Sequence, residues 1–258
     1  MTSYEVIYIR RGFKLMGKAK ENRLLLSELL SRLEGEPLEC LQKYFNTAPD
    51  WVVEALVITN FQKDTEFIRE EAVVDMIYIL AEGIVKAIDY RFLGNSYDYM
   101  WFYPVISFGG MEVLLELDHY QTTLSTITPC TMLVIPRTIF ERWIKSDMSI
   151  LSMEVKTTGS FLLEEVKRER VFLFMEGSER LSYTLMRIYE HTENNRTCTI
   201  RLSQQDLADS TGLSSKTVSR SLRELENKKL IKRSGNKIIL EESGYQRMKE
   251  LLREKTDL

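Results

Sequence analysis

One stretch near the C-terminal end, residues 202–231, constrains the fold more than any other part of the chain. It reads LSQQDLADSTGLSSKTVSRSLRELENKKLI and contains one glycine and no proline. Its apolar side chains recur at helical spacing. Gly212 lies where a helix would have to end in a left-handed residue, a conformation that glycine adopts at the lowest cost. We therefore expect two short helices that meet at a sharp turn.

The capping residues of the two helices can be read from the same stretch. Ser203 is the expected N-cap of the first helix, and Asp206 at the third helical position gives a weak capping box. Ser214 or Ser215 would cap the second helix, which we expect to end near Asn227. The apolar residues of both helices form one inward set, namely Leu207, Leu213, Val218, Leu222 and Leu225. This pattern predicts a helix-turn-helix motif.

The outward face of the second helix carries hydroxyl and basic side chains, and residues 230–240, LIKRSGNKIIL, predict a hairpin around Gly235 and Asn236. A helix-turn-helix followed by such a hairpin is a winged helix. The outward helix would fit the major groove of DNA, and a basic wing would meet phosphates. The predicted DNA contacts are Ser203, Ser214, Ser215, Lys216, Thr217, Ser219, Arg220, Arg223, Lys232, Arg233 and Lys237.

The charge of the chain is unevenly distributed. Of 35 basic and 38 acidic residues, 16 and 12 lie from Ser178 onward, which leaves a balance of +4 there and of −7 in the remainder. A basic C-terminal part on an acidic body favours a polyanionic partner. Exposed lysine and arginine side chains are usually only solvated, however, and need not bind DNA. The alternative is therefore a regulatory scaffold whose winged helix binds another protein.

The preceding part of the chain has a β texture. Residues 1–48 predict a helical extension. Residues 51–136 then contain short runs rich in β-branched and aromatic residues, among them WVVEALVITNF, DMIYIL and CTMLVIP, with turn residues between them. Such runs predict an antiparallel β-sandwich or barrel, and we assign residues 49–145 to it.

A long helix is expected next, over residues 146–176. Ser146 or Asp147 would be its N-cap, and it could run for about 28 residues, or about 42 Å. Either its apolar seam packs on the protein's own β domain or it pairs with a second copy, which we favour. The predicted dimer contacts are Met148, Leu151, Val155, Thr158 and Leu162. The winged helix would cover residues 178–245, with Ser178 as the first cap, and a C-terminal helix or tail residues 246–258. The fold class is therefore α+β.

These features together resemble the Crp/Fnr superfamily of bacterial transcription regulators. The resemblance is carried by TGLSSKTVSRSLRELE within residues 202–231 and by FIREEAVVDMIYILAEGIVKA, residues 67–87, which is similar to the superfamily's β-roll signature. It covers about residues 52–242 and implies a cyclic-nucleotide-binding-like jelly roll, a dimerisation helix and a winged helix-turn-helix. It also implies a homodimeric regulator that binds palindromic double-stranded DNA, with RNA polymerase as a further candidate partner.

The resemblance assigns one base-reading residue. Many members contact guanine through an arginine late in the TVxR segment, which is Arg220 in this sequence. Such a contact is worth about 1–3 kcal/mol of base discrimination. The cyclic-AMP-responsive members carry an Arg-Glu pair earlier in the helix, where this chain has Ser215 and Lys216. We therefore expect a different DNA half-site.

The sensor region departs from the nucleotide-binding pattern. Residues 109–124, GGMEVLLELDHYQTTL, keep a glycine and a glutamate of the phosphate-binding cassette but contain no arginine. Burying a cyclic phosphate without that cation is costly, so cyclic AMP is not expected. The aromatic run YDYMWFYPVISF, residues 97–108, is either β-roll core or the wall of an effector pocket. The candidate pocket residues are Tyr97, Tyr99, Trp101, Gly110, Glu112, Gln121, Thr122 and Thr123. The effector is unknown, and a regulator without a ligand is also possible.

Other classes of protein find little support. Cys40, Cys130 and Cys198 cannot supply the four ligands of an iron–sulfur cluster, and their wide separation fits reduced thiols in the cytoplasm. A lone histidine such as His119 could ligate haem but is more often structural. We see no catalytic Ser/His/Asp set, phosphate-binding glycine loop or metal motif, so we expect neither an enzyme nor a metal or cofactor site. No secretory signal or membrane-spanning stretch is evident, and we expect a cytoplasmic protein.

Overall fold

The computed structural model describes residues 15–92, 95–191, 197–235 and 237–256. Three helices come first, α1 (Leu15–Leu30), α2 (Gly35–Phe45) and α3 (Asp50–Ala55). The described part of the expected extension, residues 15–48, is therefore helical, but α3 corrects the assignment of WVVEA to a strand. Pro49 precedes this helix, Asp50 lies in its first turn, and Val52 and Val53 are fully buried. A helical turn buries these two neighbours together, whereas a strand would point them to opposite faces.

Two four-stranded antiparallel sheets form the β-roll, residues 57–136. One has the order β1-β8-β3-β6 and the other β2-β7-β4-β5. Their strands are β1 (Val57–Phe61), β2 (Glu66–Ile68), β3 (Met76–Glu82), β4 (Val85–Phe92), β5 (Asn95–Phe102), β6 (Ile106–Phe108), β7 (Thr123–Thr126) and β8 (Cys130–Pro136), with the short helix α4 (Gly110–Leu114) before β7. The aromatic run of residues 97–108 thus forms two strands, because Pro104 lacks the N–H that a central strand needs.

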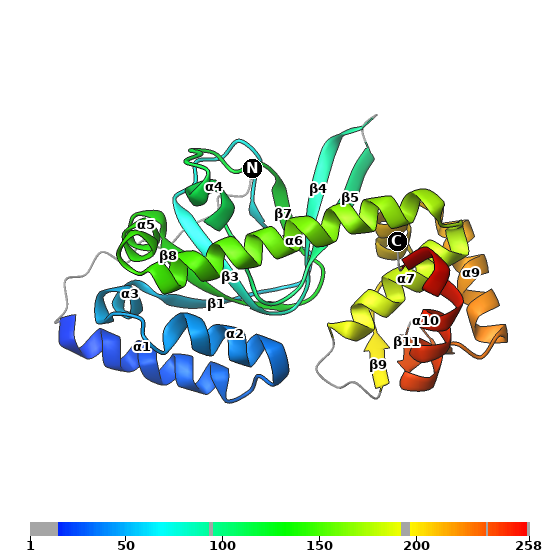
Figure 1. Ribbon diagram of the computed structural model, residues 1–258, viewed down its shortest axis with the longest axis horizontal. Helices are drawn as coiled ribbons and strands as arrows, with labels where there is room; N and C mark the ends of the chain where they lie inside the picture. The colour runs from blue at the N-terminus through cyan, green and yellow to red at the C-terminus, as the bar shows by residue number, and fades with distance from the viewer. Residues whose placement is uncertain (1–14, 93–94, 192–196, 236, 257–258) are drawn as a thin grey trace.

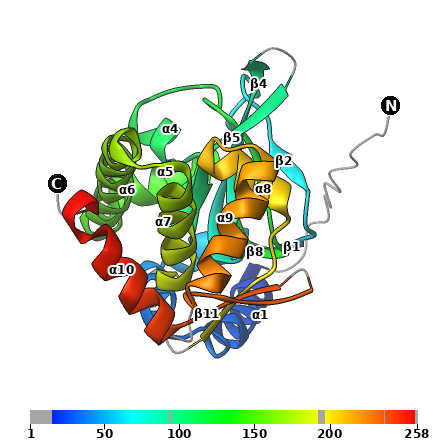
Figure 2. The ribbon, with the colours of Figure 1, turned by 90° about the vertical axis from the view of Figure 1, so that its right-hand side faces the viewer.

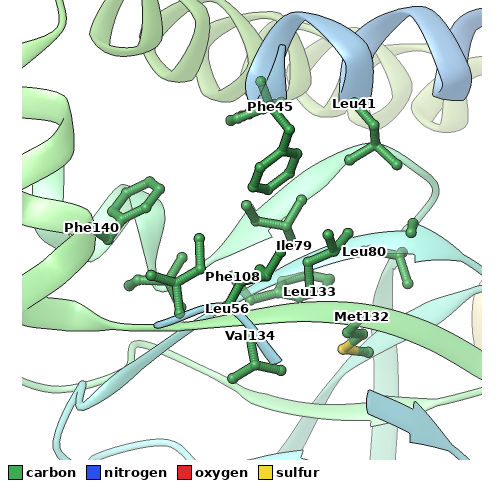
Figure 3. Close-up of a cluster of buried hydrophobic side chains, with 14 of the residues drawn as sticks. Leu41, Phe45, Leu56, Ile79, Leu80, Phe108, Met132, Leu133, Val134 and Phe140 are labelled. Carbon is green, nitrogen blue, oxygen red and sulfur yellow. The ribbon is translucent and has the colours of Figure 1, made fainter. Parts of the chain in front are cut away.

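The N-terminal helices complete the core of the β-roll. Leu41 and Phe45 of α2 point towards Ile79 of β3 and Leu133 of β8 (Figure 3), and all four side chains belong to one buried cluster. Phe140, in the helix that follows β8, belongs to the same cluster. Removing α1 to α3 would therefore expose the apolar surface of the β-roll, so the extension is part of this core.

Two helices lead from the β-roll to the C-terminal part, α5 (Arg137–Ser146) and α6 (Met148–Phe174). Asp147 is the N-cap of α6, and its side chain accepts a hydrogen bond of 2.9 Å from the backbone N–H of Ser149. In Figure 1, α6 runs from the β-roll to the C-terminal part, so that it touches both. The long helix is confirmed.

The C-terminal part, residues 177–256, contains α7 (Gly177–Glu190), β9 (Thr197–Ile200), α8 (Gln204–Thr211), α9 (Ser215–Asn227), β10 (Lys232–Ser234), β11 (Lys237–Glu241) and α10 (Glu242–Thr256). Its three strands pair in the order β10-β11-β9. Ser178 was expected to cap α7, but the N-cap is Glu176, which forms a capping box with Glu179. Helix α10 begins at Glu242, before the predicted tail at residue 246.

The predicted α+β fold is confirmed: antiparallel sheets, a long helix and a C-terminal winged helix-turn-helix follow one another along the chain. Among the described residues, no helix is both long and apolar enough to cross a membrane.

Candidate nucleic-acid interface

Helix α8 begins with a complete capping box. The Oγ atom of Ser203 accepts a hydrogen bond of 3.0 Å from the backbone N–H of Asp206, whose Oδ2 accepts one of 2.9 Å from the backbone N–H of Ser203. Aspartate therefore completes the capping box in the place of the more usual glutamate. Gly212 follows α8 with φ of 67°, as its left-handed position required.

Helix α9 is capped by Ser214, which settles the choice between two adjacent serines. The Oγ atom of Ser214 accepts a hydrogen bond of 3.1 Å from the backbone N–H of Thr217. Ser215 is the first helical residue, and its hydroxyl donates to Gln205 Oε1 at 2.9 Å. This bond fixes the start of α9 against the start of α8.

The two faces of α9 differ as the spacing predicts. Val218, Leu222 and Leu225 are buried, together with Leu207 of α8, whereas Leu213 in the turn is only half-buried. Opposite them, Lys216, Arg220 and Arg223 are exposed, and Ser215, Thr217 and Ser219 are half-buried. The first turn of α9 contains no acidic residue. The helix therefore presents three cations and several small hydroxyls on one outward face.

Ion pairs distinguish this face from the wing. Among the residues that the structure describes, Lys216, Arg220 and Arg223 pair with no carboxylate. On the wing, Lys232 pairs with Glu241, and Arg233 Nη1 lies 3.9 Å from Glu226 Oε2. Lys237 of β11 is exposed and forms no ion pair with a described residue. Positive charge is thus least neutralised on α9 and at Lys237.

The structure brings some of the candidate effector residues together. Gly110 and Glu112 lie on α4, and Glu112 Oε1 accepts a hydrogen bond of 3.3 Å from the backbone N–H of Gln121. Thr122 precedes β7, and the hydroxyl of Thr123 in that strand accepts one of 3.1 Å from the backbone N–H of Glu70. These polar groups already hold the α4–β7 connection in place.

The aromatic candidates behave differently. The side chains of Tyr97 and Tyr99 lie outside the described residues. Trp101 is buried, but it packs with the hydrophobic cluster of the C-terminal part rather than near Gly110. Inside the β-roll, the ring centroids of Phe102 and Phe108 lie 5.1 Å apart, and those of Phe102 and Phe161 of α6 lie 5.0 Å apart. Aromatic side chains therefore fill the interior between the sheets and α6.

A buried carboxyl that sequence reasoning missed joins three parts of the fold. Glu154 of α6 is fully buried, and it accepts hydrogen bonds from Tyr44 of α2 at 2.5 Å and from Ser107 of β6 at 2.6 Å. Burial raises the pKa of the Glu154 carboxyl, and the two hydrogen bonds offset only part of this effect. The sequence feature that could have indicated this site is an acidic residue on the side of α6 that faces the β-roll.

The predicted dimer contacts separate into two groups. Met148, Val155 and Leu162 are exposed, whereas Leu151 packs against the β-roll core and Thr158 is half-buried. Val166 and Leu173 are also exposed, with 59% and 77% of their surfaces accessible. These last two, with Met148, Val155 and Leu162, form what we call the exposed seam. Their separations of 7, 7, 4 and 7 residues repeat as in a coiled coil.

Comparison with known proteins agrees with this geometry. Residues 179–244 match the family model of the Crp-like helix-turn-helix domain. The C-terminal part of the chain is therefore similar to this domain family. A comparison with curated proteins found no match to the chain.

Solved structures extend the likeness beyond the Crp-like domain to the whole fold. FixK2 from Bradyrhizobium japonicum aligns with a TM-score of 0.65 at 18% identity over 75% of this chain and 96% of its own. A CRP-family transcriptional regulator from Thermus thermophilus gives 0.62 at 18% identity, over 74% of this chain and 95% of its own. The c-di-GMP-responsive global regulator CLP of Xanthomonas campestris gives 0.61 at 18% identity, over 79% and 98%. The chain therefore shares the fold of these three proteins over about three quarters of its length.

Proposed function

We propose that this chain is a sequence-specific DNA-binding transcription regulator, and that α9 of its Crp-like domain enters the major groove. The observation that carries the proposal is the outward face of α9, where Lys216, Arg220 and Arg223 are exposed and unpaired among the described residues. Unpaired cations on a rigid, capped helix can bind phosphates and base edges without first breaking an ion pair.

Within this face, Arg220 is the proposed reader of a guanine. Its guanidinium can donate two parallel hydrogen bonds to the O6 and N7 atoms of that base. Ser215 and Lys216 lie one turn closer to the start of the helix, and Ser203 and Ser214 cap the two helices beside them. The remaining proposed contacts, Thr217, Ser219, Arg223 and the wing residues Lys232, Arg233 and Lys237, would hold the helix through the DNA backbone.

We further propose that the protein acts as a homodimer through the exposed seam of α6. Leu162, Val166 and Leu173 would otherwise remain in water along a helix that already packs on the β-roll by its opposite side. A second copy carries the same apolar stripe, and two such helices can pack side by side. Two Crp-like domains would then meet two half-sites about 10 base pairs apart, so that the target is a palindrome.

The β-roll, in this proposal, senses an effector whose identity is open. The segment of residues 109–124 contains no arginine or lysine, and Glu112 within it is buried. A cyclic phosphate would therefore enter without a cation, and cyclic AMP is not the effector that we propose. We place the protein in the cytoplasm with its DNA, with RNA polymerase as a further partner and with no catalytic role.

Fluorescence anisotropy with labelled DNA tests the DNA-binding proposal. Affinity should fall steeply as salt rises, and Arg220→Ala should remove the preference for guanine at the position that Arg220 reads, worth about 1–3 kcal/mol. Arg247→Ala is the matched control, because Arg247 is exposed on α10, outside the proposed surface. If the wild type binds no DNA, or if both variants keep the same sequence preference, the reading of α9 as a recognition helix is wrong. The alternative, a regulatory scaffold whose winged helix binds another protein, would then be favoured.

A further inference from the structure

We propose that strand β5 of the β-roll fixes the orientation of the Crp-like domain through Trp101, which makes this tryptophan a positioning residue for DNA recognition. The inference rests on the proposed function, since orientation matters where two recognition helices must meet half-sites at a fixed spacing. It adds a second connection between the two parts of the chain, besides the junction of α6 and α7.

The pleat of β5 places two neighbouring aromatic residues on opposite sides. Phe102 faces inward and belongs to the buried cluster of the β-roll. Trp101 belongs to the cluster formed by the C-terminal part, which includes Leu207 and Ala208 of α8, and only 5% of its surface is exposed. Adjacent residues of a strand point to opposite faces, so the same strand can fill both cores. Ile127, from the turn after β7, joins Trp101 in the second cluster.

Helix α8, the first helix of the helix-turn-helix, packs directly against β5. In Figure 2, α8 lies in front of β5, between this strand and the viewer. A cavity of about 30 Å³ remains at the contact, lined among others by Met100 and Trp101 of β5, Thr184 of α7 and Ser210 of α8. This small volume leaves little room for water between the two parts.

The indole nitrogen of Trp101 contributes no hydrogen bond to this contact. Its Nε1 atom is buried and has no partner among the described residues. The side chain contacts the Crp-like domain through apolar packing. A phenylalanine at this position should hold the Crp-like domain as well as tryptophan does, which supplies a conservative control.

Two further contacts flank Trp101. Lys63, between β1 and β2, places its Nζ atom 3.8 Å from Asp206 Oδ2 at the start of α8. Tyr103, just after β5, stacks on His191 at the end of α7, with ring centroids 4.1 Å apart and planes at 9°. Contacts at three separate points oppose rotation of the domain about the end of α6.

The docked arrangement leaves the reading face of α9 free. Lys216, Arg220 and Arg223 remain exposed although α8 lies against the β-roll. The contact therefore orients the recognition helix without covering it, which distinguishes positioning from inhibition.

The test compares three full-length variants with the wild type. Trp101→Ala removes the buried side chain, Trp101→Phe keeps most of its packing, and Ser210→Trp disturbs the same contact from the side of α8. Each protein is titrated with two kinds of DNA. The first carries one copy of the half-site that the wild type prefers. The second carries two copies, either at the preferred spacing or with that spacing changed by one or two base pairs. Hydrogen exchange of β5 and α8 is measured on the same proteins without DNA.

We expect Trp101→Phe to keep the sharp spacing optimum of the wild type. Trp101→Ala and Ser210→Trp should lose about tenfold in affinity at that optimum, bind the single half-site normally, and exchange faster in α8 and β5. The proposal is overturned if both disruptive variants keep the wild-type spacing preference and protection. If no protein binds DNA, the proposed function fails, whereas exchange still shows whether Trp101 docks the domain.

Discussion

The phenolic hydroxyl of Tyr44 in α2 donates a hydrogen bond of 2.5 Å to Glu154 Oε1 in α6, between residues 110 positions apart in the sequence. Ser107 of β6 donates a second one, of 2.6 Å, to the other carboxyl oxygen. The N-terminal helices, which lie outside the resemblance to the Crp/Fnr superfamily, are thereby tied both to the β-roll and to the helix that carries the exposed seam. The contact of Tyr44, Ser107 and Glu154 is called the junction below, and the carboxyl group of Glu154 is buried in it.

Glu154→Gln should change the pH dependence of stability. Because the pKa of Glu154 is raised, the native protein keeps a proton that the unfolded chain releases above its ordinary value of 4.5. The free energy of unfolding of the wild type therefore falls as pH rises above that value, by up to about 1.4 kcal/mol per pH unit until the native pKa is passed. Glutamine does not titrate, so the variant should lack this slope.

Urea denaturation from about pH 5 to about pH 8 measures this slope. Glu28→Gln, at an exposed position of α1, removes the same charge and should leave the slope unchanged. An identical pH dependence in Glu154→Gln and the wild type would show that the buried carboxyl titrates as in the unfolded chain.

Gly110→Ala should strain the same junction. A Cβ atom at this position would lie 2.2 Å from Ser107 Oγ and 2.9 Å from Glu154 Oε2, both in well-packed surroundings. Overpacking of this kind costs about 1–3 kcal/mol, measured as the free energy of unfolding. Adding Ser107→Ala removes the closest contact and should recover part of the loss. A fully stable Gly110→Ala protein would mean that the side chains of Ser107 and Glu154 can move away from the added methyl group at little cost.

Leu162→Glu combined with Val166→Glu should convert the proposed dimer to a monomer. Two acidic side chains in the exposed seam would face their equivalents across a two-fold axis, where burying unpaired charges is strongly unfavourable. Sedimentation velocity distinguishes the two states. Ser160→Glu, exposed on the same helix but outside the seam, is the control and should remain dimeric. A dimeric double variant would place the interface elsewhere.

Two wing lysines should contribute unequally to DNA binding. Lys237 forms no ion pair with a described residue, whereas Lys232 already pairs with Glu241. A plot of log affinity against log salt concentration has a negative slope. Lys237→Ala should therefore make this slope less steep by about 0.9, the value for one phosphate contact. Lys232→Ala should change it less, because Glu241 competes with the phosphate. Equal slopes for the two variants would exclude this role of the ion pair.

The sequence allowed the C-terminal part to be predicted closely, because local signals determine it. The serine caps, the left-handed Gly212 and the helical spacing of Val218, Leu222 and Leu225 act within a few residues of one another. The structure reproduces each of these features. The errors at this level concern helix boundaries: α7 is capped by Glu176 and not by Ser178, and α10 begins at Glu242 and not at residue 246.

Long-range contacts were beyond sequence reasoning. Val52 and Val53 look like a strand in isolation but form part of a helix, since packing on neighbouring helices outweighs the β preference of valine. Glu154 and Trp101 depend on partners far away in the chain. Nothing local shows that a carboxyl will meet Tyr44, or that one tryptophan of an aromatic run will face another domain.

Selection from random double-stranded DNA tests whether α9 reads a DNA sequence with Arg220 as a base-contacting residue. The wild type should enrich a palindrome with half-sites about 10 base pairs apart, containing a guanine whose enrichment disappears in Arg220→Ala. If the wild type recovers no common sequence, α9 does not read a DNA sequence. If Arg220→Ala recovers the same guanine-containing site, Arg220 does not contact that base.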